Sequence, residues 1–341
     1  MPPTSTGASF FSTSHTIPRD WTTDRMPALT GTLAVVTGAN GGIGLVTARE
    51  LALAGATVIL AVRDPARGDA AARTIDNAVP GARLRVRRLD LADLGSVRDF
   101  AAELTAEHDT LDLLVNNAGV MAVPRRLTTA DGFELQLGTN HLGHFALTGL
   151  LLPALLNAPQ PRVVTVSSTL HTLGRIDFDD LHGEHRYSRY GAYGQSKLAN
   201  LLFTGELDRR ATAAGSSLRA IAAHPGYAST NLQLTGQGAV TRAVMACSNA
   251  LFAVSPRTGA RPVLCAATLP DLPGGVFVGP RGLGGYRGSP GVTRPHHRAR
   301  DQRDAARLWE LSADATGVHY DFADRGAPAH GPAGSDRRLE D

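Results

Sequence analysis

The sequence predicts an α/β fold in which one doubly wound, mostly parallel β-sheet is covered by helices on both faces. Short apolar runs alternate with longer stretches of helical periodicity along most of the chain. The apolar runs are nearly continuous, as expected of strands that are buried on both faces. The 341 residues, 43% of them hydrophobic, show no internal repeat and suffice for one large domain.

The strand and helix signals follow one another in chain order. Strands are expected at residues 33–38, 57–62, 84–91, 111–119, 162–168, 218–226 and 274–279. Helices are expected between them, for example at 43–55 and 96–108, with a short final helix near 301–313. The stretch 279–300 is rich in Gly, Pro and Arg and is interpreted as a loop.

The chain is expected to form a single domain with an extension at each end. Residues 1–30 are polar, contain proline and lack periodicity, so they are interpreted as a flexible N-terminal arm. Residues 321–341 are interpreted as a disordered tail for the same reasons. Residues 31–320 then form one Rossmann-type domain, in which 231–300 provide a substrate lid and loops.

Composition and charge argue against several classes of protein. Cys247 and Cys265 are the only cysteines and form no Cys-x-x-Cys pair, so a disulfide framework is not expected and a reducing, cytoplasmic compartment fits. The N-terminus lacks the pattern of a secretory signal, and no apolar run reaches the roughly 18 residues of a membrane span. The net charge is +3, but the densest basic run, at 83–88, is interpreted as a strand with one solvated face, and without neighbouring aromatic residues it does not favour nucleic-acid binding.

A glycine-rich turn joins the first expected strand to the first expected helix. It has the sequence Thr-Gly-Ala-Asn-Gly-Gly-Ile-Gly from residue 37 to residue 44. Glycines here would let the backbone approach a pyrophosphate, which the helix N-terminus attracts. A tight βα loop without a ligand has the same appearance, but a dinucleotide site requires this position after the first strand. The expected cofactor contacts in the turn are Gly38, Asn40, Gly42, Ile43 and Gly44.

A tyrosine and the only lysine of the chain stand four residues apart, at Tyr193 and Lys197. On a helix this spacing places both side chains on one face. A phenol with a pKa of about 10 is a poor proton donor or acceptor at neutral pH, and a neighbouring ammonium would stabilise the phenolate. Chance explains the spacing poorly, because with 6 tyrosines in 341 residues a randomly placed lysine would have it only roughly 2% of the time. The pair is therefore a candidate for proton transfer.

These motifs together resemble the short-chain dehydrogenase/reductase family over residues 30–315. The resemblance includes the glycine turn, Asn-Asn-Ala-Gly at 116–119, Tyr-Gly-Gln-Ser-Lys at 193–197 and Pro-Gly at 225–226. The long stretch between Ser168 and Tyr193 is similar to an insertion in the family's retinol-dehydrogenase-like branch. The resemblance implies that Ser168 holds the substrate oxygen, that Tyr193 and Lys197 transfer the proton, and that Asn140 kinks its helix and holds a water in the proton relay.

The same resemblance implies a nicotinamide dinucleotide bound across the carboxyl ends of the strands. In the family, residues of the third strand end cup the adenine, and the Asn-Asn-Ala-Gly segment ties neighbouring strands together and leaves room for the cofactor. A threonine after the Pro-Gly pair lies near the carboxamide and the pyrophosphate. The corresponding residues here are Asp90, Leu91, Asn116, Asn117, Ala118, Gly119, Tyr193, Lys197, Pro225, Gly226 and Thr230.

The end of the second expected strand bears on the choice between NADP and NAD. An acid at this tip would accept hydrogen bonds from the ribose 2′-hydroxyl of NAD, but the resemblance places Val62 at that position. Arg63 can contact a 2′-phosphate, which favours NADP(H). In the competing interpretation Asp64 binds the ribose and Arg63 is a solvated surface charge.

The resemblance thus implies an NADP(H)-dependent oxidoreductase that interconverts a carbonyl and an alcohol on a small hydrophobic molecule, with Tyr193 as general acid and base. Two alternatives stay open: a non-catalytic nucleotide-binding sensor or partner-binding relative, and a sugar-nucleotide epimerase or dehydratase, which normally has a larger C-terminal domain. No metal site is expected, because His182 and His185 lack a third ligand. A homo-oligomer is compatible with the sequence.

Overall fold

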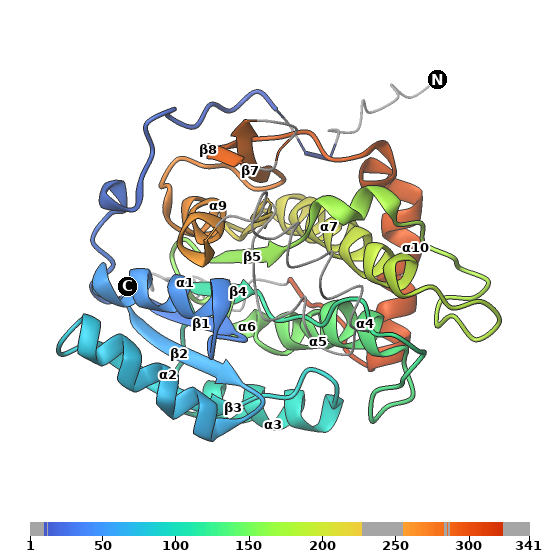
Figure 1. Ribbon diagram of the computed structural model, residues 1–341, viewed down its shortest axis with the longest axis horizontal. Helices are drawn as coiled ribbons and strands as arrows, with labels where there is room; N and C mark the ends of the chain where they lie inside the picture. Colours follow the sequence, from blue (N-terminus) through green and yellow to red (C-terminus); the bar gives the residue numbers. More distant parts are fainter. Residues whose placement is uncertain (1–9, 12, 227–254, 283–284, 286, 323–341) are drawn as a thin grey trace, which may run out of the picture.

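The computed structural model describes residues 10–11, 13–226, 255–282, 285 and 287–322, and these form a sheet between two layers of helices (Figure 1). The strand order is β3-β2-β1-β4-β5-β6-β7-β8. Neighbouring strands are parallel from β3 across to β7, and β8 is antiparallel to β7. The chain crosses from one side of β1 to the other when it passes from β3 to β4, as in a doubly wound sheet. The predicted fold class is confirmed.

The central strands are short runs of mostly β-branched and small apolar residues, which suit a pleated surface buried on both sides. The bounds of the strands are β1 Leu33–Thr37, β2 Thr57–Val62, β3 Arg83–Arg88, β4 Leu113–Asn116, β5 Arg162–Val166, β6 Arg219–Ala223, β7 Phe277–Gly282 and β8 Arg287–Val292.

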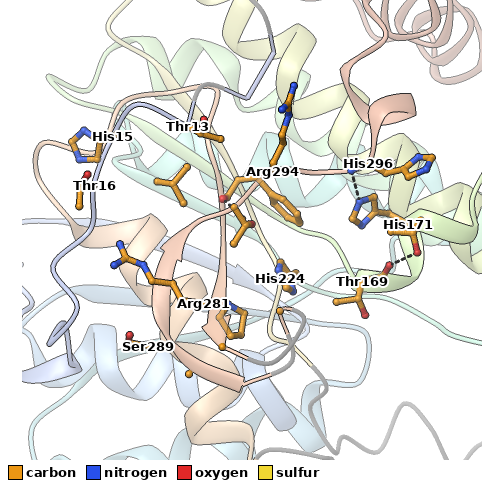
Figure 2. Close-up of a pocket in the computed structure, with 18 of the residues that line it drawn as sticks. Thr13, His15, Thr16, Thr169, His171, His224, Arg281, Ser289, Arg294 and His296 are labelled. Carbon is orange, nitrogen blue, oxygen red and sulfur yellow. Dashed lines mark hydrogen bonds between the residues drawn. The ribbon is translucent and has the colours of Figure 1, made fainter.

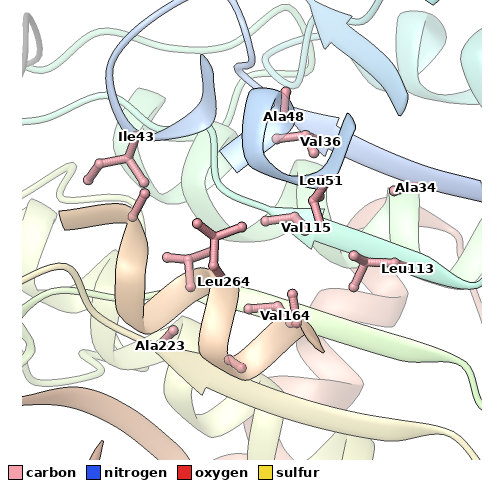
Figure 3. Packing of buried hydrophobic residues seen from close by; sticks show 14 of the residues in the cluster. Ala34, Val36, Ile43, Ala48, Leu51, Leu113, Val115, Val164, Ala223 and Leu264 are labelled. Carbon is pink, nitrogen blue, oxygen red and sulfur yellow. The ribbon is translucent and has the colours of Figure 1, made fainter. Parts of the chain in front are cut away.

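Alternate residues of each strand pack against opposite helix layers. Helices α1 (Gly42–Leu53), α2 (Pro65–Ala78) and α9 (Pro256–Thr268) cover one face, and Figure 3 shows Val36 and Val164 of the sheet packed with residues of α1 and α9. On the other face, Val35 and Val163 pack against further helices. These are α3 (Leu94–Glu107), α5 (Gly143–Leu150), α6 (Leu152–Leu156), α7 (Arg189–Ala213) and α10 (Gln302–Thr316).

Aspartates define where three of the helices begin. The carboxylates of Asp64, Asp93 and Asp301 accept hydrogen bonds from backbone N–H groups in the first turns of α2, α3 and α10, which satisfies donors that a helix N-terminus leaves without partners. Shorter helical elements lie in the connections between the main elements. They are η1 (Thr23–Arg25), α4 (Leu135–Leu137), the π-helical turn η2 (Gly138–Leu142), η3 (Thr169–Leu173) and η6 (His297–Arg300).

The interpretation of residues 279–300 as a loop was wrong for part of that stretch. Residues of this stretch complete β7 and form β8, which pairs with β7 through Gly279↔Gly291 and Pro280↔Pro290. Glycine and proline weaken a strand signal in sequence, but an edge strand tolerates proline because one side of its backbone needs no partner. The final helix expected near 301–313 is confirmed as α10.

The described part of the N-terminal segment is packed against the domain and does not form a flexible arm. Phe10, Phe11, Ile17 and Trp21 are each at most 5% exposed. The ring of Phe11 lies 6.2 Å from that of Phe277 on β7. The sequence prediction missed this because four apolar residues scattered among polar ones have no periodicity, although each can still fill a gap in the surface. Residues 1–9 and 12, residues 231–254 of the predicted lid, and residues 323–341 of the predicted tail lie outside the described residues.

Candidate active site

A cavity of about 660 Å³ lies at the carboxyl ends of the central strands, where the sequence places the dinucleotide. Most of the predicted contact residues line it together: Gly38, Asn40, Gly42, Ile43, Gly44, Arg63, Asp90, Leu91, Asn117, Ala118, Gly119, Ser168, Tyr193, Lys197, Pro225 and Gly226. Segments that are more than 180 residues apart in sequence therefore meet in one cavity.

The glycine turn is built by close contacts between backbone segments. Gly38 has a left-handed backbone with φ of 67°, which glycine adopts without strain. A methyl group on Gly44 would lie 2.4 Å from the Gly38 carbonyl oxygen and 2.5 Å from Asn117 Nδ2. The Asn117 amide in turn donates to the Thr37 carbonyl over 2.8 Å. Glycine at 44 lets α1 begin directly against the ends of β1 and β4.

Not every predicted contact residue faces the cavity. Asn116 is fully buried and donates from Nδ2 to Thr148 Oγ1 over 3.0 Å, so its side chain joins β4 to α5 and does not line the cavity. The prediction of Asn116 as a cofactor contact is therefore corrected. The next residue, Asn117, has the opposite orientation because successive side chains at the end of a strand alternate between faces. Thr230 lies outside the described residues.

The end of β2 presents two cations to the cavity. Arg63 is exposed and lines the cavity, and so does Arg67, which the sequence analysis missed. Arg67 lies in the first turn of α2, only four residues after Arg63, so a second arginine this close to the strand end was a signal that could have found it. The Asp64 carboxylate accepts hydrogen bonds from the backbone N–H groups of Ala66 and Arg67, at 3.0 and 3.3 Å. Both bonds end on Oδ1, and Asp64 also lines the cavity.

Tyr193, Ser168 and Lys197 come together as predicted. Tyr193 and Lys197 lie on α7, are 5% and 3% exposed, and have the ammonium 5.8 Å from the centre of the phenol ring. Burial raises the pKa of Tyr193 to about 12, and a hydrogen bond with the Ser168 side chain lowers it in part. Burial also lowers the pKa of Lys197 to about 8. The pKa of Tyr193 therefore lies above that of a free phenol, and not below it as the sequence suggested, because burial disfavours the phenolate.

Lys197 is held by the end of β5. Its Nζ donates to the Val166 carbonyl over 2.9 Å, and its own carbonyl accepts from the Ser167 hydroxyl over 2.8 Å. These contacts fix the start of the buried half of α7 against the sheet. A lysine with a pKa of about 8 can take up and release a proton near neutral pH.

Asn140 lies in the π-helical turn η2, so the predicted irregularity of this helix is present. Its side chain accepts from the Val120 backbone N–H at 2.7 Å and donates to the Val120 carbonyl at 2.9 Å. Nδ2 also lies 2.9 Å from Ser196 Oγ. Asn140 therefore joins the loop after β4 to α7 at the residue next to Lys197.

A buried histidine, which the sequence analysis missed, joins Asn140 to the glycine turn. His144 Nδ1 lies 3.0 Å from the Asn140 carbonyl oxygen, and its Nε2 lies 2.9 Å from Thr37 Oγ1. The carbonyl can only accept, so Nδ1 carries the proton; burial lowers the His144 pKa to about 4, which keeps the ring neutral, and Nε2 accepts from the threonine hydroxyl. Thr37 Oγ1 also accepts the N–H groups of Asn117 and Ala118, each at 2.9 Å.

No group of three or more potential metal ligands occurs among the described residues. His182, the candidate from the sequence, stacks on Phe133 at 5.5 Å and accepts from the Glu134 backbone N–H over 3.3 Å. Within the same part of the chain, every helix is too short or too polar to cross a membrane.

The chain belongs to the short-chain dehydrogenase family, whose model matches residues 32–237. It is an oxidoreductase that acts on alcohol or carbonyl groups with a nicotinamide dinucleotide. The fold and the predicted order of motifs agree with this assignment.

The relatives refine the assignment to the retinol-dehydrogenase-like branch. The chain is 42% identical to retinol dehydrogenase 11 of Mus musculus over 297 residues, which cover 86% of this chain and 89% of the relative. It is 43% identical to polyprenol dehydrogenase of Mus musculus over 297 residues, with 86% of each chain covered.

Solved structures agree with the sequence comparison. An uncharacterised protein from Mycobacterium paratuberculosis is 51% identical, with a TM-score of 0.74 and coverage of 88% of this chain and 99% of that one. A Beutenbergia cavernae protein described as an NAD(P)-dependent gluconate 5-dehydrogenase, with bound NADP, is 28% identical, with a TM-score of 0.56 and coverage of 71% and 91%.

Proposed function

We propose that the protein is an NADP(H)-dependent enzyme that interconverts a carbonyl and an alcohol on a hydrophobic molecule, with Tyr193 as the group that gives and takes the proton. One observation carries this proposal: Ser168 and Tyr193 line the same cavity as the glycine turn and Lys197. Proton donor and dinucleotide turn must share one space for a hydride and a proton to reach the same carbonyl group.

The residues of the cavity fit a dinucleotide. Gly38, Gly42 and Gly44 leave backbone accessible at the N-terminus of α1, which suits a pyrophosphate. Asp90 and Leu91 line the part that would hold the adenine, and Lys197 would bond the nicotinamide ribose. When bound, the nicotinamide supplies or accepts the hydride.

The protein's own residues would handle the proton as follows. In reduction, Tyr193 begins protonated, as its raised pKa requires, and transfers its proton to the carbonyl oxygen that the Ser168 hydroxyl holds. Lys197, with a pKa of about 8, can return a proton to the site near neutral pH. Asn140 bonds both the Val120 backbone and Ser196. It therefore fixes the position of the loop after β4 relative to helix α7, beside Lys197.

Two features support NADP over NAD. Arg63 and Arg67 both line the cavity at the end of β2, where a 2′-phosphate would lie, and guanidinium groups bind phosphate well. The Asp64 carboxylate, the competing ribose ligand, is already bonded to two N–H groups of α2. The Beutenbergia cavernae relative with bound NADP is consistent with this choice.

The relatives support a long, apolar alcohol or aldehyde as the substrate. Retinol and polyprenol, from which two of the relatives take their names, are both isoprenoid primary alcohols. Ser168, Thr169 and Leu170 line the cavity beside Tyr193 and can contact such a chain.

The test is NADPH-dependent reduction of retinal and of a panel of aliphatic aldehydes. We expect Tyr193→Phe to lower kcat by about 10²–10⁴-fold while NADPH still binds. Tyr190→Phe is the matched control, because Tyr190 lies on the same helix but outside the cavity. Equal rates for Tyr193→Phe and wild type would show that Tyr193 is not the proton donor, and no reduction of any member of the panel would refute the substrate class.

A further inference from the structure

A second cavity, of about 1100 Å³, lies beside the dinucleotide cavity (Figure 2). It is bounded by the N-terminal segment, by η3 and by the β7–β8 hairpin. Thr169 lines both cavities. We call this second space the basic cavity, for the side chains described next.

The charged side chains in the described lining of the basic cavity are all positive. Arg19, Arg281 and Arg294 line it from three separate segments, and no Asp or Glu occurs among the described residues of the lining. Arg281 donates to the Ile17 carbonyl, which ties it to the N-terminal segment. The charges of Arg19 and Arg294 are not neutralised by any acidic side chain of that lining. A concave surface with charges of one sign concentrates ions of the opposite sign.

His224 places a hydrogen-bond donor in this cavity. The ring is 4% exposed, lines the cavity and lies between Arg281 and Thr169 in Figure 2. Its Nδ1 accepts from the Gly226 backbone N–H over 3.2 Å, so the single proton of the neutral ring is on Nε2. Burial lowers the pKa of His224 to about 3, which keeps the ring neutral.

The donor of His224 has no partner within the described residues. Nε2 lies over Gly279, where a methyl group would come within 1.9 Å of it, and no hydrogen bond from Nε2 is formed to the described part of the chain. An N–H donor without a protein acceptor is available to a ligand. An oxygen ligand in the basic cavity could accept a hydrogen bond from it.

Residues that are neighbours in the chain line the two cavities. His224 lines the basic cavity, and the next residues, Pro225 and Gly226, line the dinucleotide cavity. On the other side, Ser168 lines the dinucleotide cavity and His171 the basic one, joined by a 2.6 Å contact from His171 Nδ1 to the Ser168 carbonyl. Thr169, which lines both cavities, is the residue that a molecule held at the Ser168 hydroxyl would pass to reach the basic cavity.

We propose that the basic cavity receives an acidic group, a carboxylate or a phosphate, carried by the same substrate whose carbonyl or alcohol oxygen lies at Ser168 and Tyr193. The inference rests on the proposed function and adds apolar chains with a remote acid to its substrate class. The Nε2–H of His224 donates to the acid, and the guanidinium groups of Arg19 and Arg294 neutralise it.

Paired substrates of equal chain length test the proposal. We expect wild type to reduce ω-oxododecanoate with a kcat/KM about tenfold above that for dodecanal, and Arg294→Gln to remove most of this advantage without changing the value for dodecanal. Arg73→Gln, which removes an exposed arginine of α2 outside both cavities, is expected to preserve the advantage.

Two substitutions of His224 distinguish the roles of its two ring nitrogen atoms. His224→Gln can keep a donor near the position of Nε2, whereas His224→Asn keeps only an acceptor near the position of Nδ1. We expect the glutamine variant to retain more of the preference for ω-oxododecanoate than the asparagine variant. The reverse order would contradict the donor assigned to Nε2. If both variants fold poorly, Arg294→Gln still decides the proposal.

Calorimetric titration with dodecanoate provides a readout without turnover. We expect its dissociation constant to rise about tenfold in Arg294→Gln and to stay unchanged in Arg73→Gln. Equal binding by wild type and Arg294→Gln would overturn the role of the basic cavity.

If dodecanoate binding follows the expectation but neither aldehyde is reduced, the proposed function fails and the acid-binding cavity stands. If both aldehydes are reduced equally and inorganic phosphate binds as tightly as dodecanoate, the cavity takes a free anion and the assignment to the substrate is wrong.

Discussion

The two cavities of this protein lie side by side but are built in different ways. The dinucleotide cavity is lined largely by backbone and small residues from turns that directly follow β1, β4, β5 and β6, such as Gly38, Ala118 and Gly226. The basic cavity is lined by arginine, histidine and hydroxyl side chains from the N-terminal segment, η3 and the β7–β8 hairpin. The first is encoded in short local motifs, whereas the second exists only after distant segments pack together.

The largest expected effect tests whether the N-terminal segment is part of the folded domain. Trp21→Ala is expected to lower the free energy of unfolding by about 3–5 kcal/mol, because Trp21 is 2% exposed and its removal leaves a cavity in the core beneath α9 and β1. Urea unfolding measures this loss. Leu53→Ala is the control, because Leu53 is 62% exposed and its removal is expected to change stability by less than about 0.5 kcal/mol. A Trp21→Ala variant as stable as wild type would mean that the segment adds nothing to the fold.

The same contrast explains what the sequence could predict. The glycine turn, Asn117, Ser168, Tyr193 and Lys197 were found because each is part of a short motif or stands at a strand end, and parallel strands bring their carboxyl ends to one edge of the sheet. The inner strands β1, β2, β4, β5 and β6 were found because burial on both faces leaves a continuous apolar run.

The missed features lack any local signal. β8 contains glycine and proline, which are common in loops, and its pairing with β7 is visible only in three dimensions. Asn116 was assigned to the cofactor because a motif gives residue types and not the face on which each side chain lies. His144 and His224 carry no pattern of their own, since their roles follow from partners such as Thr37 and Gly226.

Acid is expected to destabilise both regions through their buried histidines. The pKa values of His144 and His224 are about 4 and about 3 in the folded protein and about 6.5 when unfolded, so between these values the unfolded state binds more protons. Stability is therefore complete above pH 6.5 and falls as the pH drops, by about 2 kcal/mol per histidine between pH 7 and pH 5.

Melting temperatures at pH 7 and pH 5 measure this loss. The melting temperatures of His144→Gln and His224→Gln should each differ less between pH 7 and pH 5 than that of wild type. Each variant lacks one of the groups that take up a proton on unfolding. His185→Gln is the control, since His185 is exposed. An unchanged pH dependence in His144→Gln would contradict the neutral ring assigned between Thr37 and Asn140.

Replacing each of two glycines of the same turn by alanine tests whether a close contact is the reason that glycine is needed there. Gly44→Ala is expected to cost about 1–3 kcal/mol of stability and to weaken NADPH binding, because the new carbon would lie 2.4 Å from the Gly38 carbonyl. At Gly41 the added carbon would have no atom of the described chain within 4 Å, and the backbone is extended there, so Gly41→Ala is expected to keep wild-type stability. Equal losses in the two variants would show that chain flexibility, and not the contact of Gly44, limits the turn.

The smallest effect concerns the arginines at the β2 end of the dinucleotide cavity. Arg63→Ala is expected to raise the NADPH dissociation constant about tenfold, which corresponds to about 1.4 kcal/mol, and to leave the NADH dissociation constant unchanged, because only NADPH has the 2′-phosphate. Arg67→Ala is expected to have an effect of the same sign, since Arg67 lines the same end of the cavity. Fluorescence titration with both cofactors measures the ratio. Because Arg63 is exposed, solvent screens its charge, and the effect should shrink as the salt concentration rises. Tighter binding of NADH than of NADPH by wild type would contradict the assignment and return Asp64 to consideration as the ribose ligand, despite its hydrogen bonds to α2.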